Sequence, residues 1–225
     1  MLSTALLALV GSGEYLPGMA AVDRRLLAAA APPTRPARVA CLPTAAGQEG
    51  EAQVERWLRL GVEHFRRLGA EPQPVRVVDR ATADDPAAAA VVAAADLIYF
   101  SGGDPVYLYE SLAGSQTWAA VQGAQARGAV LAGCSAGAMI MAHAVPDVRD
   151  RDLALRPAFG LVPAAVILPH FDRLEGYRPG ATALAQGRLR DGQFALGIDE
   201  DTALIGRPAE AWEVQGAGAV TVLTR

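Results

Sequence analysis

A serine stands between two glycines in the segment Gly133-Cys134-Ser135-Ala136-Gly137. An apolar run typical of a buried strand ends at residue 132, and a helical pattern begins at residue 138. This is the context of a nucleophile elbow, a tight and strained turn that exposes a serine hydroxyl between small neighbours. The N–H groups at the helix start, that of Ala136 first, would favour a developing oxyanion. The segment predicts Ser135 as the nucleophile of a serine hydrolase, although the bare pattern also fits an ordinary glycine-rich turn.

Cys134 is a second candidate nucleophile, because glutamine amidotransferases place a cysteine on a similar elbow. It lies one residue before the centre of the turn, at the end of the apolar run. We expect Cys134 to face the core as a small buried hydrophobic residue.

Three histidines could act as the general base that a serine hydroxyl needs. His143 follows Ser135 by eight residues, which is about 12 Å along a continuous helix and too far for proton transfer. His64 borders the apolar stripe of an amphipathic helix, so we expect a partly exposed structural histidine there. His170 follows the apolar run 164–169, where a strand meets a loop, the usual location of site residues in α/β sheets. His170 is therefore the predicted base.

The third member of such a site is a carboxylate that holds the imidazole tautomer and stabilises its charged form. Three acids follow one another between two apolar runs, and a fourth lies two residues after His170. Neighbouring like charges disfavour one another unless the turn is solvated or functional. A solvated turn is the preferred interpretation from this pattern alone, so the choice of acid stays open. The candidates are Asp172, Asp199, Glu200 and Asp201.

Two further glycine-containing turns follow apolar runs. Ser101-Gly102-Gly103-Asp104 comes after the run 97–100, and its glycines could present a second N–H group to an oxyanion. A Gly-Gly pair also fits an ordinary turn. Residues 11–14, Gly-Ser-Gly-Glu, follow the first run but lack the full Gly-x-Gly-x-x-Gly pattern, so they do not support dinucleotide binding.

The elements that must position these residues alternate along the chain. Apolar runs at 5–10, 38–42, 75–78, 97–100 and 129–132 are separated by helical stretches rich in alanine and leucine. Strands that are apolar on both faces and alternate with helices are typical of a parallel sheet covered by helices. We therefore expect an α/β fold, with a doubly wound, mostly parallel sheet and helices on both faces, in a single domain spanning 1–225.

The clearest helix covers residues 51–68, where apolar residues recur at i, i+3, i+4 and i+7 and should pack on the sheet. From about residue 161 the pattern changes to shorter apolar runs. These runs predict further strands with partly antiparallel pairing. They lie at 164–168, 194–198, 203–205 and 220–223.

Composition excludes several classes of function. The 20 basic residues are all arginine, and the chain has no lysine and no asparagine. A Walker A loop, a pyridoxal Schiff base and a Ser-Lys dyad each need a lysine, and a Cys-His-Asn site needs an asparagine. A formal charge of -4 offers no basic patch for nucleic acid.

The cysteines and the first ten residues indicate the cellular compartment that we expect. Cys41 and Cys134 show no paired spacing, so we expect neither a disulfide nor a metal cluster, and a cytoplasmic, reducing compartment fits. The apolar segment 1–10 is similar to a signal sequence but lacks a basic start, so we expect no cleavage. About ten apolar residues cannot span a bilayer.

Four motifs in order carry a resemblance that covers most of the chain: Phe100-Ser101-Gly102-Gly103-Asp104, Gly133-Cys134-Ser135-Ala136-Gly137-Ala138, Pro169-His170-Phe171 and residues 197–204. They resemble the peptidase E (aspartyl dipeptidase) and cyanophycinase family. That resemblance implies a class I glutamine-amidotransferase-like fold and a Ser-His-Glu triad. Ser135 would be the nucleophile, His170 the base and Glu200 the orienting acid, with oxyanion N–H groups from Gly103, next to Gly102, and from Ala136.

The implied reaction is hydrolysis of a dipeptide or short peptide through an acyl-enzyme, with no metal and no organic cofactor. The substrate side chain stays open, because the aspartyl dipeptidase branch carries asparagine where this chain has Asp104. An ionised Asp104 would repel an aspartyl side chain yet could bind an amino group. Arg173 and Arg178 could bind a carboxylate, or they are solvated surface arginines.

Two other functions remain compatible with the sequence. The first is a non-catalytic, amidotransferase-like module that binds a small molecule in the same pocket. The second is a glutamine amidotransferase that uses Cys134. We expect no membrane partner, and a homodimer is compatible with the sequence.

Overall fold

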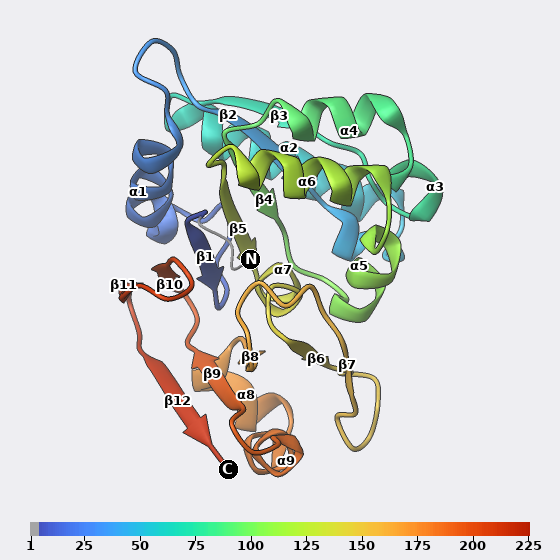
Figure 1. Cartoon of the computed structure of the whole chain (residues 1–225), viewed down its shortest axis with the longest axis vertical. Helices are drawn as coiled ribbons and strands as arrows, with labels where there is room; N and C mark the ends of the chain where they lie inside the picture. The colour runs from blue at the N-terminus through green and yellow to red at the C-terminus, as the bar shows by residue number, and fades with distance from the viewer. Residues whose placement is uncertain (1–4) are drawn as a thin grey trace.

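Residues 5–225 are described by a computed structural model of the chain (Figure 1). The first four residues of the signal-like segment lie outside this range. The larger of two sheets has seven strands in the order β11-β10-β1-β5-β4-β2-β3. The pairs from β1 to β3 are parallel, and β10 and β11 join antiparallel. Its strands are β1 (Leu7–Val10), β2 (Arg38–Leu42), β3 (Glu71–Pro74), β4 (Leu97–Phe100), β5 (Val130–Cys134), β10 (Thr202–Gly206) and β11 (Trp212–Gly216).

A second sheet of five strands has the order β12-β9-β8-β6-β7. Its inner pairs are parallel and both of its edge strands are antiparallel. The predicted strands after residue 161 exist and are partly antiparallel, but their division between two sheets was not predicted. The strands are β6 (Ala144–Pro146), β7 (Leu155–Pro157), β8 (Ala165–Leu168), β9 (Phe194–Ile198) and β12 (Val220–Thr224).

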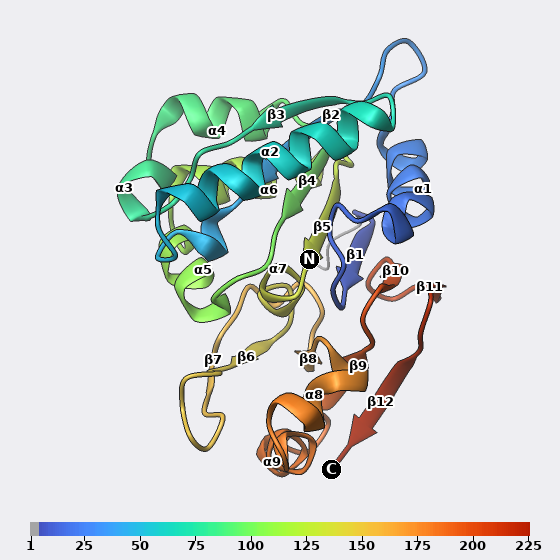
Figure 2. The same ribbon diagram turned by 180° about the vertical axis from the view of Figure 1, so that it is seen from behind.

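Helices cover both faces of the larger sheet, as Figures 1 and 2 show from opposite sides. Successive residues of a strand point to opposite faces. In β4, Leu97 and Tyr99 therefore pack with Phe65 of α2 (Glu51–Arg67), whereas Ile98 and Phe100 belong to the apolar cluster on the other face. This arrangement confirms the predicted mostly parallel α/β fold, and α2 closely matches the helix expected at 51–68.

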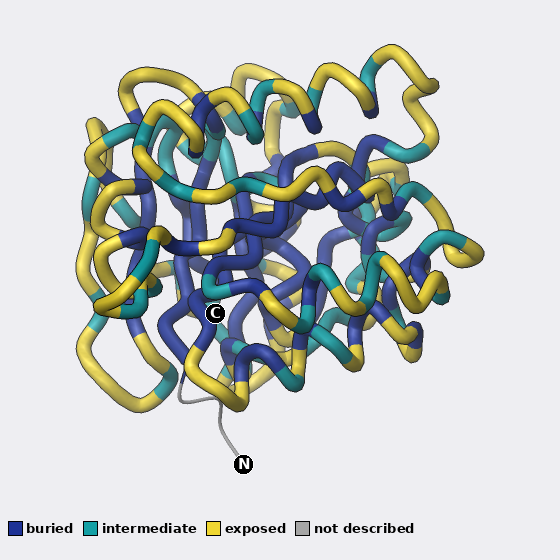
Figure 3. The backbone as a smooth tube through the Cα atoms, turned by 90° about the horizontal axis from the view of Figure 1, so that it is seen from above, coloured by how far each residue is buried: buried dark blue, intermediate teal, exposed yellow. Residues whose placement is uncertain are grey.

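The remaining helices are mostly short. Figure 3 shows buried segments in the interior of the molecule and exposed segments around them. Every residue of β1, β4 and β8 is buried. Among residues 5–225, no helix combines the length and apolar character needed to cross a bilayer. They are α1 (Ala20–Ala30), α3 (Arg80–Ala83), α4 (Pro86–Ala93), α5 (Pro105–Leu112), α6 (Gln116–Ala126), α7 (Ala136–Met139), α8 (Phe171–Tyr177) and α9 (Ala181–Arg188), with 3-10 turns η1 (Pro17–Met19) and η2 (Thr44–Ala46).

The strand predicted at residues 75–78 is wrong in position, because the paired segment β3 ends at Pro74. The Val75 N–H still donates to the Cys41 carbonyl beyond the end of β3, at 3.0 Å. The Val77 N–H instead donates to the Val75 carbonyl. Both valines are buried, so their apolar alternation reports packing against the core and not strand pairing.

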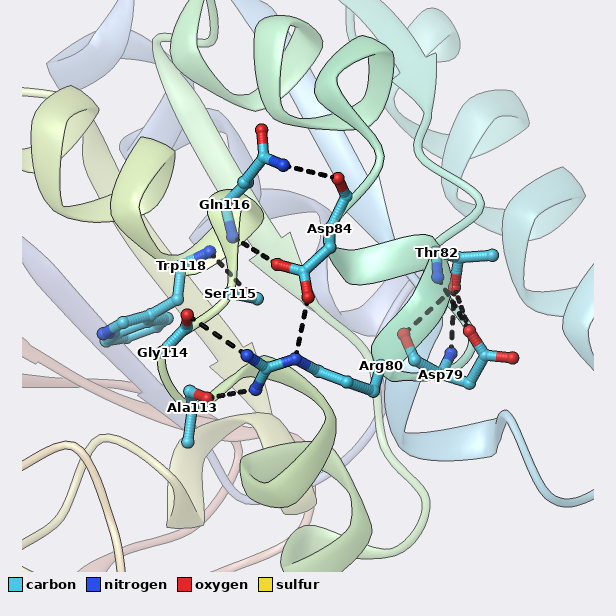
Figure 4. A network of polar contacts seen from close by, with 9 residues as sticks. All are labelled: Asp79, Arg80, Thr82, Asp84, Ala113, Gly114, Ser115, Gln116 and Trp118. Atoms are coloured by element: carbon cyan, nitrogen blue, oxygen red, sulfur yellow. Dashed lines mark hydrogen bonds and ion pairs between the residues drawn. The ribbon is translucent and has the colours of Figure 1, made fainter.

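A network of exposed polar side chains connects α3 with the start of α6 (Figure 4). The Asp79 side chain accepts from the Thr82 N–H at 2.8 Å and caps α3. After α3, the Asp84 carboxylate accepts from Arg80 Nε at 2.9 Å and from the Gln116 N–H at 3.0 Å, which ties α3 to the start of α6. Local capping and one long-range contact thus set the position of α3.

Candidate active site

Ser135 lies on the turn between β5 and α7 with φ 49° and ψ −110°. L residues rarely adopt this conformation, and it is held here by the surrounding packing. A Cβ on Gly133 would collide with the Gly137 backbone, and a Cβ on Gly137 would collide with the Phe100 carbonyl oxygen. The two glycines of the motif are therefore required by close backbone approach, and the turn leaves Ser135 lining a pocket.

His170 lies between β8 and α8 in the left-handed region, with φ 52° and ψ 36°. Its Nε2 is 3.2 Å from Ser135 Oγ, and its Nδ1 is 2.8 Å from Glu200 Oε1. A carboxylate only accepts hydrogen bonds, so Nδ1 carries the hydrogen and Nε2 is left to accept the Ser135 proton. Three turns, from both sheets, thus bring a hydroxyl, an imidazole and a carboxylate into one hydrogen-bonded chain.

Glu200 is held on the turn between β9 and β10 by contacts on several sides. Its N–H donates to Asp172 Oδ1 at 2.8 Å, and the Tyr177 hydroxyl donates to its Oε1 at 3.4 Å. Arg173 Nε is 3.3 Å from Asp172 Oδ2 and 3.9 Å from Glu200 Oε2. Asp172, one of the candidate acids, therefore supports Glu200 and does not contact the imidazole.

The other two acids of the turn point elsewhere. Asp199 Oδ2 accepts from the Ala219 N–H at 2.8 Å. Asp201 has φ 52°, and its carboxylate occupies the space where a side chain on Gly13 would stand. The acid cluster is thus a structured turn in which Glu200 faces His170, and not simply a solvated loop.

Two backbone N–H groups, on the turns after β4 and β5, are candidates for binding an oxyanion. That of Ala136 begins α7, and that of Gly103 belongs to the turn after β4; neither has a hydrogen-bond partner among the described residues. Gly103 has φ 140°, and a Cβ there would collide with the Ala45 carbonyl. The Gly102 N–H is already used, because it donates to Glu14 Oε1 at 2.9 Å.

The pocket that Ser135 and His170 line has a volume of about 560 Å³. Its lining is largely apolar, with charged groups at Arg149, Asp150 and Arg178. Asp104 lies outside this lining and pairs with Arg149. Asp104 caps α5 by accepting from the Tyr107 N–H at 2.8 Å. The apolar side chains include Met139, Pro146, Leu153, Leu168 and Leu174.

A sequence model of peptidase family S51 matches residues 7–211. The chain belongs to this family. The match includes Ser135, His170 and Glu200, and it confirms the resemblance to the peptidase E and cyanophycinase group.

Individual relatives agree with the family assignment. A cyanophycinase from Geminocystis herdmanii (strain PCC 6308) is 30% identical over 173 residues, which are 72% of this chain and 62% of the cyanophycinase, so this chain spans less than two thirds of that relative. The crystal structure of a peptidase from an acI-B1 Actinobacterium is 36% identical, with a TM-score of 0.89 over 98% of this chain and 91% of that one. A provisionally named peptidase E protein from Listeria monocytogenes EGD-e shares the fold, at 17% identity and a TM-score of 0.67 over 95% of this chain and 99% of that one.

In this S51 chain the two predicted arginines have different places. Arg178 lines the pocket, where its guanidinium donates to the backbone carbonyls of Val148, Asp150 and Arg151. Arg173 is exposed and stands behind Glu200, outside the pocket lining. Arg178 is thus already engaged by backbone carbonyls, whereas Arg173 contacts the two carboxylates only through Nε and lies outside the pocket lining.

Sequence reasoning missed two charged residues at the site. Arg149 pairs with Asp104 at 2.5 Å. Glu14 contacts Gly102, on the turn after β4, and Cys134, directly before Ser135. The sequence position of Glu14 could have indicated its place at the site, because it follows the first strand at the same sheet edge as the two glycine turns. Arg149 had no such indication beyond its place in an arginine-containing loop.

Cys134 is fully buried, as predicted, and its Sγ donates to Glu14 Oε2 at 2.9 Å. Burial first, and then the charge of Glu14, raise the pKa of the Cys134 thiol well above its ordinary value. A buried, protonated thiol is a poor nucleophile. This geometry does not favour the amidotransferase alternative.

The other two histidines lie away from Ser135. The α7 helix ends at Met139, so the continuous helix assumed for His143 is wrong; its N–H donates to the Ala165 carbonyl at 2.9 Å and its side chain is exposed. His64 is not partly exposed as expected but buried, with Nε2 2.7 Å from Asp23 Oδ2. Its exposed neighbours, Glu63 and Arg66, concealed this from the sequence.

Proposed function

We propose that this protein is a serine peptidase that cleaves dipeptides or short peptides through an acyl-enzyme. Ser135 is the nucleophile, His170 the general base and Glu200 the acid that orients it. The observation that carries the proposal is the hydrogen-bonded chain from Ser135 Oγ through His170 to Glu200 at the wall of a pocket. Membership in peptidase family S51 supports the same reaction.

In the first step, Ser135 Oγ attacks the carbonyl carbon of the scissile bond while its proton passes to His170 Nε2. The 3.2 Å separation between these atoms is within hydrogen-bond reach. The Nδ1–H bond to Glu200 keeps the tautomer correct and stabilises the imidazolium that forms. Negative charge then develops on the substrate oxygen, where the N–H groups of Gly103 and Ala136 would stabilise it.

The tetrahedral intermediate then collapses, which breaks the scissile C–N bond, and His170 gives its proton to the departing amine. In the second half of the reaction, water attacks the ester on Ser135 while His170 again accepts a proton. The second intermediate then collapses, which breaks the ester bond, and His170 returns the proton to Ser135 Oγ. Both halves of the reaction pass through an imidazolium and an oxyanion, so His170, Glu200 and the two N–H groups would act in both. No step of this mechanism uses a metal or an organic cofactor.

The pocket favours an apolar side chain beside the scissile bond. Arg149 is paired with Asp104, Arg178 is bound to backbone carbonyls, and Asp150 accepts from the Asp152 N–H at 2.7 Å. Of the two lining arginines, Arg149 is thus already paired with a carboxylate, and Arg178 already donates to backbone carbonyls. Burial of a leucine- or phenylalanine-sized side chain against the apolar walls would contribute roughly 1.5–3 kcal/mol. The cyanophycinase name belongs to the relative, and the substrate proposed here rests on this pocket.

The test is hydrolysis of a library of dipeptides and short peptides by wild type and Ser135→Ala. We expect wild type to release amino acids, with apolar side chains preferred, and Ser135→Ala to release none. A fluorophosphonate probe should add to Ser135 in the wild type. Equal labelling or equal turnover by the Ser135→Ala variant would show that the proposed function is wrong.

Cys134→Ser is the matched control, because it keeps a hydrogen-bond donor for Glu14 while removing the thiol. It should retain peptidase activity. Glutaminase activity that is lost in Cys134→Ser and kept in Ser135→Ala would support the amidotransferase alternative. Tight peptide binding with no turnover and no labelling would instead support a non-catalytic binding module.

A cytoplasmic location is part of the proposal. Cys41 and Cys134 are both free and buried, which suits a reducing compartment. A homodimer stays compatible with this function, and light scattering on the purified protein would give the oligomeric state.

A further inference from the structure

Glu14 links the turn after β4 to the end of β5, directly before Ser135. Its Oε1 accepts from the Gly102 N–H at 2.9 Å, and its Oε2 accepts from Cys134 Sγ at 2.9 Å. Gly102 directly precedes Gly103, whose N–H is one proposed oxyanion donor. Cys134 directly precedes Ser135, and the second donor, Ala136, directly follows it.

The sheet order explains how one side chain reaches both turns. The strand β5 lies between β1 and β4, and the three strands are parallel, so their carboxyl ends meet at one edge. Glu14 belongs to the turn after β1 and spans β5 to reach the turn after β4. A Cβ on Gly102 would lie 2.9 Å from Glu14 Oε1 and 3.4 Å from the Ser135 Cβ, which shows how closely the turns approach.

A carboxylate suits this position because two donors must be satisfied. It offers two acceptor oxygens, whereas an amide of the same shape offers one oxygen and two donor hydrogens. The Cys134 thiol is protonated and therefore available as a donor, as described above. Glu14 does not line the pocket, so it has no contact with a substrate bound there.

We propose that Glu14 is a positioning residue, which holds the Gly102–Gly103 turn and the Ser135 turn at the separation needed for Gly103 and Ala136 to bind one oxyanion. This inference rests on the proposed function. Such a residue acts on the transition state and leaves ground-state substrate binding largely unchanged.

The expected effect is a loss in kcat. Glu14→Ala leaves the Gly102 N–H and the Cys134 thiol without their acceptor, and a displacement of about 1 Å in a catalytic group costs about 100-fold in rate. We expect kcat to fall by about 100-fold in Glu14→Ala, with KM changed by less than about threefold. Glu14→Gln restores one acceptor, so its kcat should fall by only about tenfold.

The experiment measures kcat, KM and melting temperature for wild type, both Glu14 variants and Glu213→Ala. Glu213 is a matched control, because it is an exposed glutamate on β11, outside the pocket lining, whose carboxylate contacts Arg25 and the side-chain amide of Gln215. A peptide aldehyde adds a second measurement, since its tetrahedral adduct on Ser135 carries the oxyanion. Its affinity should fall in Glu14→Ala by the same factor as kcat/KM, while Glu213→Ala stays like the wild type.

Three outcomes would overturn the role of Glu14: an unchanged kcat in Glu14→Ala, a loss confined to KM, or aldehyde affinity that does not change. If Glu14→Ala does not fold, the Glu14→Gln variant is the test. A loss of about tenfold in kcat would support the role of Glu14, and an unchanged kcat would overturn it. Ser135→Ala keeps this test separate from the proposed function. An inactive Ser135→Ala beside a fully active Glu14→Ala would reject only the inference about Glu14.

Discussion

Two histidine–carboxylate pairs in this chain have almost the same length and very different surroundings. His170 Nδ1 lies 2.8 Å from Glu200, with side chains 33% and 30% exposed, whereas His64 Nε2 lies 2.7 Å from Asp23, with side chains 3% and 1% exposed. The first pair stands at the wall of the pocket. The second is closed off between α1 and α2.

The difference lies in what the rest of each ring contacts. The second nitrogen of His170 faces Ser135 Oγ, while the His64 ring lies 5.2 Å from the Phe65 ring and 6.0 Å from the Tyr15 ring, between centroids. His170 also adopts a left-handed backbone, whereas His64 lies within a regular helix. A carboxylate partner alone therefore does not indicate chemistry. A nucleophile on the other nitrogen and access to a pocket do.

The largest expected effect is on His170. His170→Gln should lower kcat by about 10⁶-fold, because loss of the base in comparable serine hydrolases costs about that much. Its melting temperature should stay close to that of the wild type, since the imidazole is partly exposed. Steady-state kinetics and calorimetry measure the two quantities. A variant that keeps a tenth of the wild-type activity would contradict the role of His170.

Glu200→Gln comes next. The amide keeps the shape of the side chain but favours the wrong imidazole tautomer, which is worth about 10⁴-fold in kcat. The control is Asp199→Asn on the same turn, which should stay within about tenfold of the wild type, because its carboxylate bonds to the Ala219 N–H and not to the imidazole. Equal losses in the two variants would refute the special role of Glu200.

His64→Leu should affect stability and not chemistry. Removal of one partner of a buried pair leaves an uncompensated charge, which costs about 3–5 kcal/mol of unfolding free energy. Activity per folded molecule should be unchanged. Urea unfolding beside kinetics checks both, and a large loss of kcat in the folded variant would show that the two pairs are coupled.

The same variant has a pH signature. Burial raises the pKa of Asp23 above its ordinary value of 3.8, and the His64 hydrogen bond that opposes this shift is absent in His64→Leu. A raised pKa in the folded state means that stability is greatest below the unfolded value and falls as the pH rises through the folded value. The deficit relative to wild type should therefore be largest at neutral pH and shrink toward pH 3.8.

The smallest effect is expected at the exposed carboxylate of Asp79. Asp79→Ala removes the N-cap of α3, which costs about 1 kcal/mol, and activity should not change. The loss gives the contribution of an exposed, hydrogen-bonded carboxylate to the free energy of unfolding, for comparison with the buried carboxylate of Asp23. Thermal unfolding detects it, and a loss as large as that of His64→Leu would contradict the comparison.

The sequence was most informative where the signal is local. The elbow around Ser135 was predictable because Gly133 and Gly137 are both required by contacts within a few residues of the turn, and by Phe100 at the end of the neighbouring strand. His170 was predictable because an apolar run ends just before it. The mostly parallel sheet followed from the alternation of apolar runs with helices.

Long-range pairings were not predictable. Glu14 and Cys134 are separated by 120 positions, and Asp23 and His64 by 41. Nothing in the local pattern around His64 shows that Asp23 will meet it. The second sheet was missed for the same reason, because an apolar run such as 194–198 identifies a strand but not its neighbours.

Ser135 follows β5 of the seven-stranded sheet, whereas His170 follows β8 of the five-stranded sheet, and Glu200 lies where the chain passes from β9 to β10. The proposed nucleophile and its proposed base therefore come from two different sheets. In the proposed mechanism, activity depends on how the two sheets pack together, because neither sheet carries both groups. If this mechanism holds, a substitution in the core of the five-stranded sheet that displaces His170 will lower activity without altering the turn at Ser135.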